Sequence, residues 1–81
     1  MNVTVHLFAA AKDAAKTPEL SLELSPSATV AVLREQLVKT CPALAPLQDI
    51  LHIAVNNNYA ASDQIISGDD EIACFPPVSG G

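Results

Sequence analysis

The stretch TVAVLREQLVKTC (residues 29–41) decides the fold of this chain. The apolar positions on one face of the helix that it predicts are Val30, Leu33, Leu37 and Cys41. Thr29 or Ser27 can cap the first turn, and Pro42 ends the helix because proline disfavours helical geometry in the residue before it. A helix with one apolar face must pack on other elements, so the flanking segments are expected to supply a sheet.

Two strands are expected before this helix. Residues 3–8 alternate strictly, with Val3, Val5 and Leu7 on one side, and residues 20–24 alternate Leu with Ser and Glu. Between them, AAAKDAAK (residues 9–16) consists of good helix formers but is short, so one or two helical turns are expected there. The two strands are expected to pair with each other through this connection.

Several short elements are expected after the helix. In order, they are a loop bracketed by Pro42 and Pro46, a strand over residues 51–55, a turn over 56–58, a turn over 67–70 and a last strand over 71–75. The three consecutive asparagines of the first turn tolerate positive φ, which predicts a tight hairpin into Tyr59. Two prolines end the last strand because neither can donate to a ladder.

These elements bury all their apolar faces only if the helix packs on one side of a single mixed sheet. That arrangement is the α+β fold called β-grasp, or ubiquitin-like. We expect residues 1–75 to form this one domain and residues 76–81 to form a flexible C-terminal tail that ends in Gly-Gly. The composition agrees, because 49% hydrophobic and 16% charged residues are typical of a folded domain.

The charge of the chain excludes two classes of partner. Only 4 Lys and Arg residues stand against 9 Asp and Glu, a formal net charge of −5. Nucleic acids and anionic membranes bind clustered basic charge, so neither is expected as a partner. The N-terminal residues lack a signal-peptide pattern, and no apolar run reaches the roughly 20 residues of a bilayer span. We therefore expect a cytoplasmic protein.

Metal ligands and nucleophiles are few. Cys41 and Cys74 lie far apart and lack the close pairing of zinc or redox sites, so both are expected to be reduced packing residues. His6 and His52 fall within expected strands and outside any catalytic pattern. No metal site is therefore expected.

The segment with distinctive chemistry is the ending PPVSGG (residues 76–81). The two glycines have no Cβ atoms, so they can thread a narrow channel and leave the terminal carbonyl open to attack. The two prolines stiffen the exit from the domain. Tail residues extend about 3.3–3.6 Å each, so the tail can reach roughly 20 Å into the active site of a partner. The residues expected to insert are Pro76, Pro77, Val78, Ser79, Gly80 and Gly81.

With this ending, the chain resembles the small, sulfur-carrying subunits of molybdopterin synthases over its whole length. Weaker similarities to that family lie in FAAAKD (residues 8–13), TVAVLREQL (29–37) and AVN (54–56). Lys12 and Asp13 stand where the family usually has Arg and Glu. In GDDEI (residues 68–72) the glycine is displaced by one position, so Asp69 is expected at the left-handed site of the turn.

The resemblance implies a two-stage mechanism centred on Gly81. An ATP-dependent adenylating enzyme, similar to the ubiquitin-activating type, joins AMP to the Gly81 carboxylate, and a sulfur donor protein then converts the adenylate to a thiocarboxylate (1-thioglycine). The loaded tail enters the large subunit of molybdopterin synthase, where its sulfur attacks cyclic pyranopterin monophosphate to build the molybdopterin dithiolene. The AMP is thus transient, no cofactor is bound permanently, and catalytic residues are expected on the large subunit rather than on this chain.

The resemblance further implies a heterotetramer with two small subunits at opposite ends of a large-subunit dimer. Docking on the partner is expected from Phe75, Phe8 and Lys12, together with apolar residues on the sheet face away from the helix. Core packing is an equal alternative for Phe75 and the favoured one for Phe8, and Lys12 can equally be a surface lysine without a role. The acidic group at residues 69–71 can meet a basic patch on a partner, but a solvated turn is the favoured interpretation.

Other functions remain open. A sulfur carrier for thiamine thiazole synthesis shares the fold and the Gly-Gly end, although its tail is not expected to carry Pro-Pro-Val-Ser. A ubiquitin-like modifier would join Gly81 to lysines by isopeptide bonds. A plain interaction domain would tolerate changes in the tail.

Overall fold

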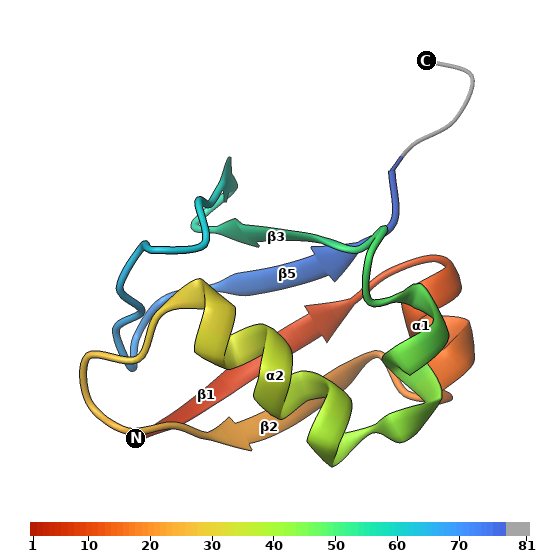
Figure 1. Cartoon of the computed structure of the whole chain (residues 1–81), viewed down its shortest axis with the longest axis horizontal. Coiled ribbons are helices and arrows are strands. Elements are labelled where there is room, and N and C mark those ends of the chain that lie inside the picture. Colours follow the sequence, from red (N-terminus) through yellow and green to blue (C-terminus); the bar gives the residue numbers. More distant parts are fainter. Residues whose placement is uncertain (78–81) are drawn as a thin grey trace.

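The computed structural model describes residues 1–77, and its strands form one mixed sheet in the order β2-β1-β5-β3-β4 (Figure 1). The elements are β1 (Asn2–Leu7), α1 (Ala10–Ala15), β2 (Glu19–Glu23), α2 (Val30–Thr40), the 3₁₀-helix η1 (Pro42–Leu47), β3 (His52–Val55), β4 (Asn58–Tyr59) and β5 (Ile72–Phe75). Helix α2 lies across one face of the sheet (Figure 1). This is the β-grasp arrangement that the sequence predicts.

The core lies between the sheet and α2. The buried side chains of β1 are Val3, Val5 and Leu7, and those of α2 are Val30, Leu33 and Leu37. Strand β2 pairs antiparallel with β1, and β5 pairs parallel with β1 and antiparallel with β3. Because alternate strand residues point to opposite faces, this register places the remaining residues of β1 and β5 on the face away from α2, which we call the outer face.

Helix α2 is preceded by a capping residue, Thr29, and followed by the proline that begins η1. The Thr29 Oγ1 accepts a hydrogen bond from the Val32 N–H at 3.4 Å, so Thr29 rather than Ser27 is the cap. The expected loop after Pro42 is instead η1. A proline is tolerated in the first turn of a helix because its missing N–H would have no intrahelical partner there. The side chain of Leu44 is fully buried, which anchors η1 to the core.

The two predicted turns are present, and one of them has a different geometry. Asn56 and Asn57 have φ angles of 53° and 70°, which is the geometry of a two-residue hairpin turn. Asp69 does not adopt the expected positive φ. Its turn is closed by a bond from the Asp70 N–H to the Ser67 carbonyl at 3.1 Å, and the Asp70 carboxylate accepts from the Ser67 N–H at 2.8 Å. These two hydrogen bonds between Ser67 and Asp70 therefore hold the turn without a residue of positive φ at position 69.

The chain leaves the sheet from its central strand. Figure 1 shows the end of β5 beside the end of β1, and the Phe8 N–H donates to the Cys74 carbonyl at 3.1 Å. After β5, Pro76 is half-buried and Pro77 is exposed. The predicted tail positions 78–81 lie outside the described residues.

Candidate functional site

The root of the tail is the first part of the candidate site. Pro76 and Pro77 follow β5 directly, at the sheet end where β1 finishes and β3 begins. The roles predicted for Val78, Ser79, Gly80 and Gly81 lie beyond the described part of the chain, so they stay predictions.

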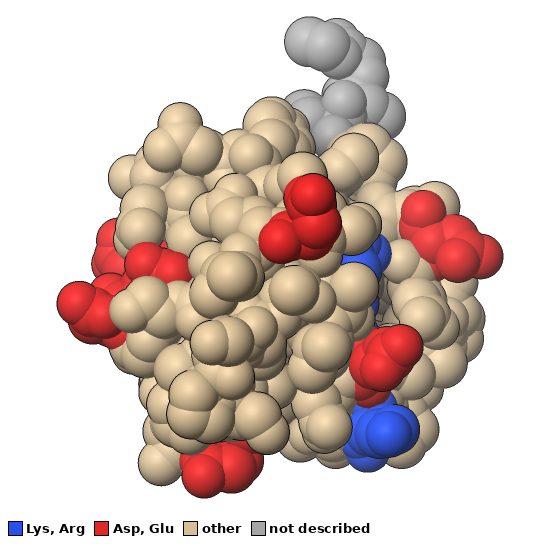
Figure 2. All heavy atoms as spheres, turned by 60° about the vertical axis from the view of Figure 1, so that its left-hand side comes forward, with Lys and Arg blue, Asp and Glu red and all other residues tan. Residues whose placement is uncertain are grey.

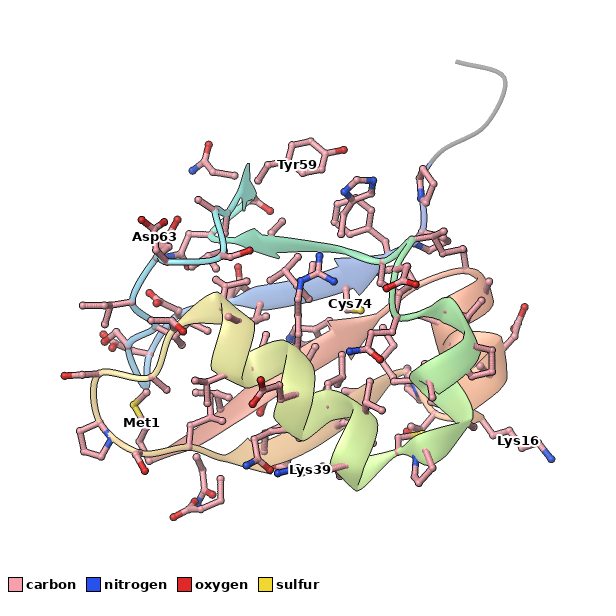
Figure 3. The ribbon with its side chains drawn as sticks, viewed as in Figure 1. Met1, Lys16, Lys39, Tyr59, Asp63 and Cys74 are labelled. Carbon is pink, nitrogen blue, oxygen red and sulfur yellow. The ribbon has the colours of Figure 1, made fainter. Side chains whose placement is uncertain are left out.

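Three rings form an aromatic cluster, His52, Tyr59 and Phe75, on the outer face beside the tail root. The His52 centroid lies 5.6 Å from that of Tyr59 and 5.9 Å from that of Phe75, and the Tyr59 and Phe75 centroids are 5.7 Å apart. These separations are typical of favourable aromatic contacts. Tyr59 is 73% exposed and projects from the molecule in Figure 3. Phe75 is half-buried within this cluster, outside the core between the sheet and α2.

Phe8 and Lys12 extend the surface around the tail root. The core position favoured for Phe8 is wrong, because its side chain is 52% exposed. The alternation of β1 turns Phe8 to the outer face, which no second layer of the described chain covers. Lys12 is exposed on α1. Both side chains are therefore accessible to a partner, and their docking roles stay predictions.

A hollow of about 260 Å³, which no pattern in the sequence predicts, lies next to the aromatic cluster. We call it the outer-face hollow; its lining residues are His6, Phe8, Asn57, Glu71, Ile72 and Ala73. Its depth comes from the register, since His6 stands opposite the small Ala73. The His6 ring lies 3.6 Å from the Glu19 carboxylate. Among the lining residues of the hollow are the aromatic Phe8 and the acidic Glu71.

The basic side chains of the molecule are confined to its two α-helices and the cap of α1. The four basic residues of the chain are Lys12, Lys16, Arg34 and Lys39, and all belong to α1, its C-terminal cap or α2. Figure 2 shows acidic side chains spread over the visible face, with fewer basic ones. None of the four basic residues therefore lies on a strand of the sheet.

Arg34 holds the connection between η1 and β3, a role that the sequence does not reveal. Its Nη1 donates to the Gln48 carbonyl at 3.2 Å, and its Nη2 donates to the Leu51 carbonyl. These carbonyls precede β3, whose first residue is His52. The guanidinium therefore fixes the start of the strand that carries the aromatic cluster.

The cysteines and histidines occupy the predicted kinds of position. Cys74 is fully buried, and burial raises the pKa of its thiol to about 11 against a smaller lowering by Arg34. Figure 3 shows Cys74 inside the body of the molecule. Cys41 is half-buried at the end of α2. The histidines lie in β1 and β3 as expected, but sequence reasoning missed the place of His52 in the aromatic cluster.

Two kinds of feature are absent from residues 1–77. No group of three side chains of the metal-ligating types lies together there. Nor does that part of the chain hold a helix with the length and apolar character needed to cross a bilayer.

The sheet order, the single long helix on one face and the exit of the chain from the central strand define a ubiquitin-like protein of the β-grasp class. Within that class, the chain belongs to the ThiS family, whose sequence profile matches residues 5–81.

Individual relatives agree with this assignment. The molybdopterin synthase sulfur carrier subunit of Drosophila yakuba is 37% identical over 84 residues, which cover 100% of this chain and 92% of that protein. The protein of the same name from Arabidopsis thaliana is 31% identical, with 100% and 84% covered. The crystal structure of SAMP1 from Haloferax volcanii superposes with a TM-score of 0.89 at 29% identity and covers 100% of both chains. The predicted kinship with molybdopterin synthase sulfur carriers is confirmed.

Proposed function

We propose that this chain is the sulfur carrier subunit of a molybdopterin synthase and acts in the cytoplasm. The observation that carries the proposal is the match over the whole chain to two sulfur carrier subunits, combined with a Gly-Gly end that follows the central strand. The acidic composition is compatible with a protein partner rather than a nucleic acid.

The chemistry starts at the Gly81 carboxylate, which at neutral pH is an anion and a poor electrophile. An adenylating enzyme joins this carboxylate to the AMP part of ATP and releases pyrophosphate. Sulfur from a donor protein then displaces AMP, which leaves a thiocarboxylate on Gly81. The thiocarboxylate sulfur then attacks cyclic pyranopterin monophosphate on the large subunit, and water cleaves the bond between that sulfur and the Gly81 carbonyl carbon. The sulfur stays on the pterin, and Gly81 is again a carboxylate that can be reloaded. AMP is on this chain only between the first two steps.

The domain docks while the tail inserts. The aromatic cluster, with Phe8 beside it, offers an accessible apolar surface at the tail root, and aromatic residues are frequent anchors of interfaces. Lys12 is exposed on α1 and can pair with a carboxylate of the large subunit. Docking at this place keeps the tail, with its reach of roughly 20 Å, directed at the partner.

The test is intact-protein mass spectrometry after incubation with ATP, the adenylating enzyme and a sulfur donor. We expect a mass increase equal to the exchange of one oxygen for one sulfur, localised to Gly81 and dependent on ATP. Gly81→Ala, or one residue added after Gly81, should lose the activity with an unchanged fold. Gly68→Ala is the matched control, because a Cβ there meets only Met1 atoms at 3.8 and 3.9 Å. Full product formation by the Gly81→Ala chain would contradict the proposal.

The modifier function is the second candidate. It is favoured by the likeness to SAMP1, the small archaeal modifier protein 1 of H. volcanii. Under this alternative, cell extract and ATP should produce conjugates of higher mass that disappear when Gly81 is deleted. The thiamine thiazole carrier stays a further prediction, which identification of the co-purifying partner would decide.

A further inference from the structure

We propose that the outer-face hollow receives an arginine side chain from the large subunit of the synthase. The choice of partner rests on the proposed function. The choice of an arginine side chain rests on the shape and charge of the hollow, which is formed by β1, the start of β5 and the β3–β4 turn.

The sheet itself builds the hollow. On the outer face of β5, the small side chain of Ala73 stands opposite His6 in the parallel pairing of β1 with β5. Phe8 follows His6 at the end of β1, and Asn57 closes the opposite side from the hairpin turn. A short side chain between larger neighbours leaves a depression that water fills unless a partner does.

Glu71 gives the hollow its charge. Within residues 1–77, no hydrogen bond or ion pair reaches the Glu71 carboxylate, although its backbone is bound to Asn56. The four basic residues of the chain lie on α1, its C-terminal cap and α2, and no ion pair joins any of them to Glu71 within residues 1–77. The hollow therefore carries an unmatched negative charge that favours a cation from outside the chain.

Arginine matches the walls better than other side chains do. Its flat guanidinium can stack on the exposed ring of Phe8 and donate two parallel hydrogen bonds to the Glu71 carboxylate. Lysine offers a point charge without the planar face, and an apolar side chain would bury the carboxylate unpaired. Because the hollow lies next to the aromatic cluster, an arginine seated there would belong to the same interface.

One experiment needs no partner protein. The ¹⁵N-labelled chain is titrated with N-acetyl-arginine amide, and with N-acetyl-leucine amide as control, while backbone amide shifts are followed by NMR. We expect saturable shifts at Glu71, Ala73 and Phe8 with the arginine probe alone, lost in Glu71→Gln. Shifts of equal size with both probes, or none at these residues, would overturn the proposal.

A second experiment uses the large subunit and isothermal titration calorimetry. Glu71→Gln and Ala73→Leu should each weaken binding at least about tenfold, the first by removing the charge and the second by filling the hollow. Asp63→Asn, an exposed carboxylate outside the hollow, should bind like the unaltered chain. Unchanged binding by both hollow variants would refute the arginine site and leave the proposed function intact. Failure of the unaltered chain to bind would count against the proposed function, and the arginine-amide titration would still decide the hollow.

Discussion

Asn56 and Asp70 are joined by a hydrogen bond of 3.0 Å, from Nδ2 to Oδ1, that ties the β3–β4 hairpin to the segment before β5. The same Asn56 side chain accepts from the Glu71 N–H at 2.9 Å, and its backbone N–H donates to the Glu71 carbonyl at 2.8 Å. Glu71 lines the outer-face hollow, and the hairpin carries Tyr59. This bridge therefore fixes the hollow and the aromatic cluster relative to each other.

Replacing Asn56 should destabilise the fold, and two variants separate the loss of its side-chain hydrogen bonds from the cost of its positive φ. Asn56→Ala removes two side-chain hydrogen bonds and forces alanine to a φ of 53°, so we expect the free energy of unfolding to fall by about 2–3 kcal/mol. Asn56→Gly loses the same bonds without the steric cost and should be about 1 kcal/mol more stable than the alanine variant. Urea denaturation measures both. Equal stability of the two variants would show that the backbone geometry carries no cost.

Replacing Arg34 by lysine should lower the stability of the fold. One ammonium cannot span the carbonyls of Gln48 and Leu51 as the guanidinium does, so Arg34→Lys should lower the free energy of unfolding by about 1–2 kcal/mol. Lys39→Arg, the same exchange in reverse at an exposed position of α2, should change it by less than about 0.5 kcal/mol. Thermal unfolding of the two variants makes the comparison. A neutral Arg34→Lys change would remove the stabilising role assigned to the guanidinium.

The buried thiol of Cys74 should make stability fall in alkali. Its pKa is raised from 9.0 to about 11 in the folded chain, so the unfolded chain loses this proton first as pH rises. The stabilising contribution is complete below pH 9 and is lost as pH approaches 11. Denaturation curves between pH 8 and 11 for the native chain and Cys74→Ala measure it, with the roughly pH 9–11 decline expected to be shallower in the variant. Parallel curves would contradict the assignment.

The aromatic cluster should matter more for binding than for folding. Tyr59→Ala removes a side chain that is 73% exposed, so we expect a loss of about 1 kcal/mol in stability but at least tenfold weaker binding to the large subunit. Ile65→Ala is the control, because Ile65 is also apolar and 62% exposed but lies in the segment that bridges to Thr29. Calorimetry distinguishes them, and an equal effect of both variants would exclude a specific role for the cluster.

The sequence predicted the elements whose periodicity reflects burial. The alternation of Val3, Val5 and Leu7, and the spacing of Val30 and Leu33, follow from one apolar face meeting the core, and the structure has both. The turn at residues 56–57 was equally predictable, because asparagine tolerates the positive φ that a tight hairpin needs.

Other features depend on pairings that no local pattern contains. The outer-face hollow exists because β1 and β5 pair with His6 opposite Ala73, and residues far apart in sequence set that register. The Arg34 bonds depend on carbonyls fourteen and seventeen residues away. Phe8 was misjudged because its residue type favours burial, whereas its face of the sheet has no covering layer in the described chain. The segment predicted as a loop forms the helix η1, because burial of the Leu44 side chain in the core stabilises an ordered backbone there.

Strand β5 is both the central strand of the sheet and the strand that leads into the tail. β5 pairs with both β1 and β3, yet it is the last strand of the described chain to be synthesised. A nascent chain on the ribosome therefore cannot complete the sheet until residues 72–75 have emerged. A product truncated before β5 would have no central strand and would be open to proteases. Every molecule that extends past β5 thus already contains the strand that the fold requires. Chains that stop before β5 cannot present a folded domain to a partner.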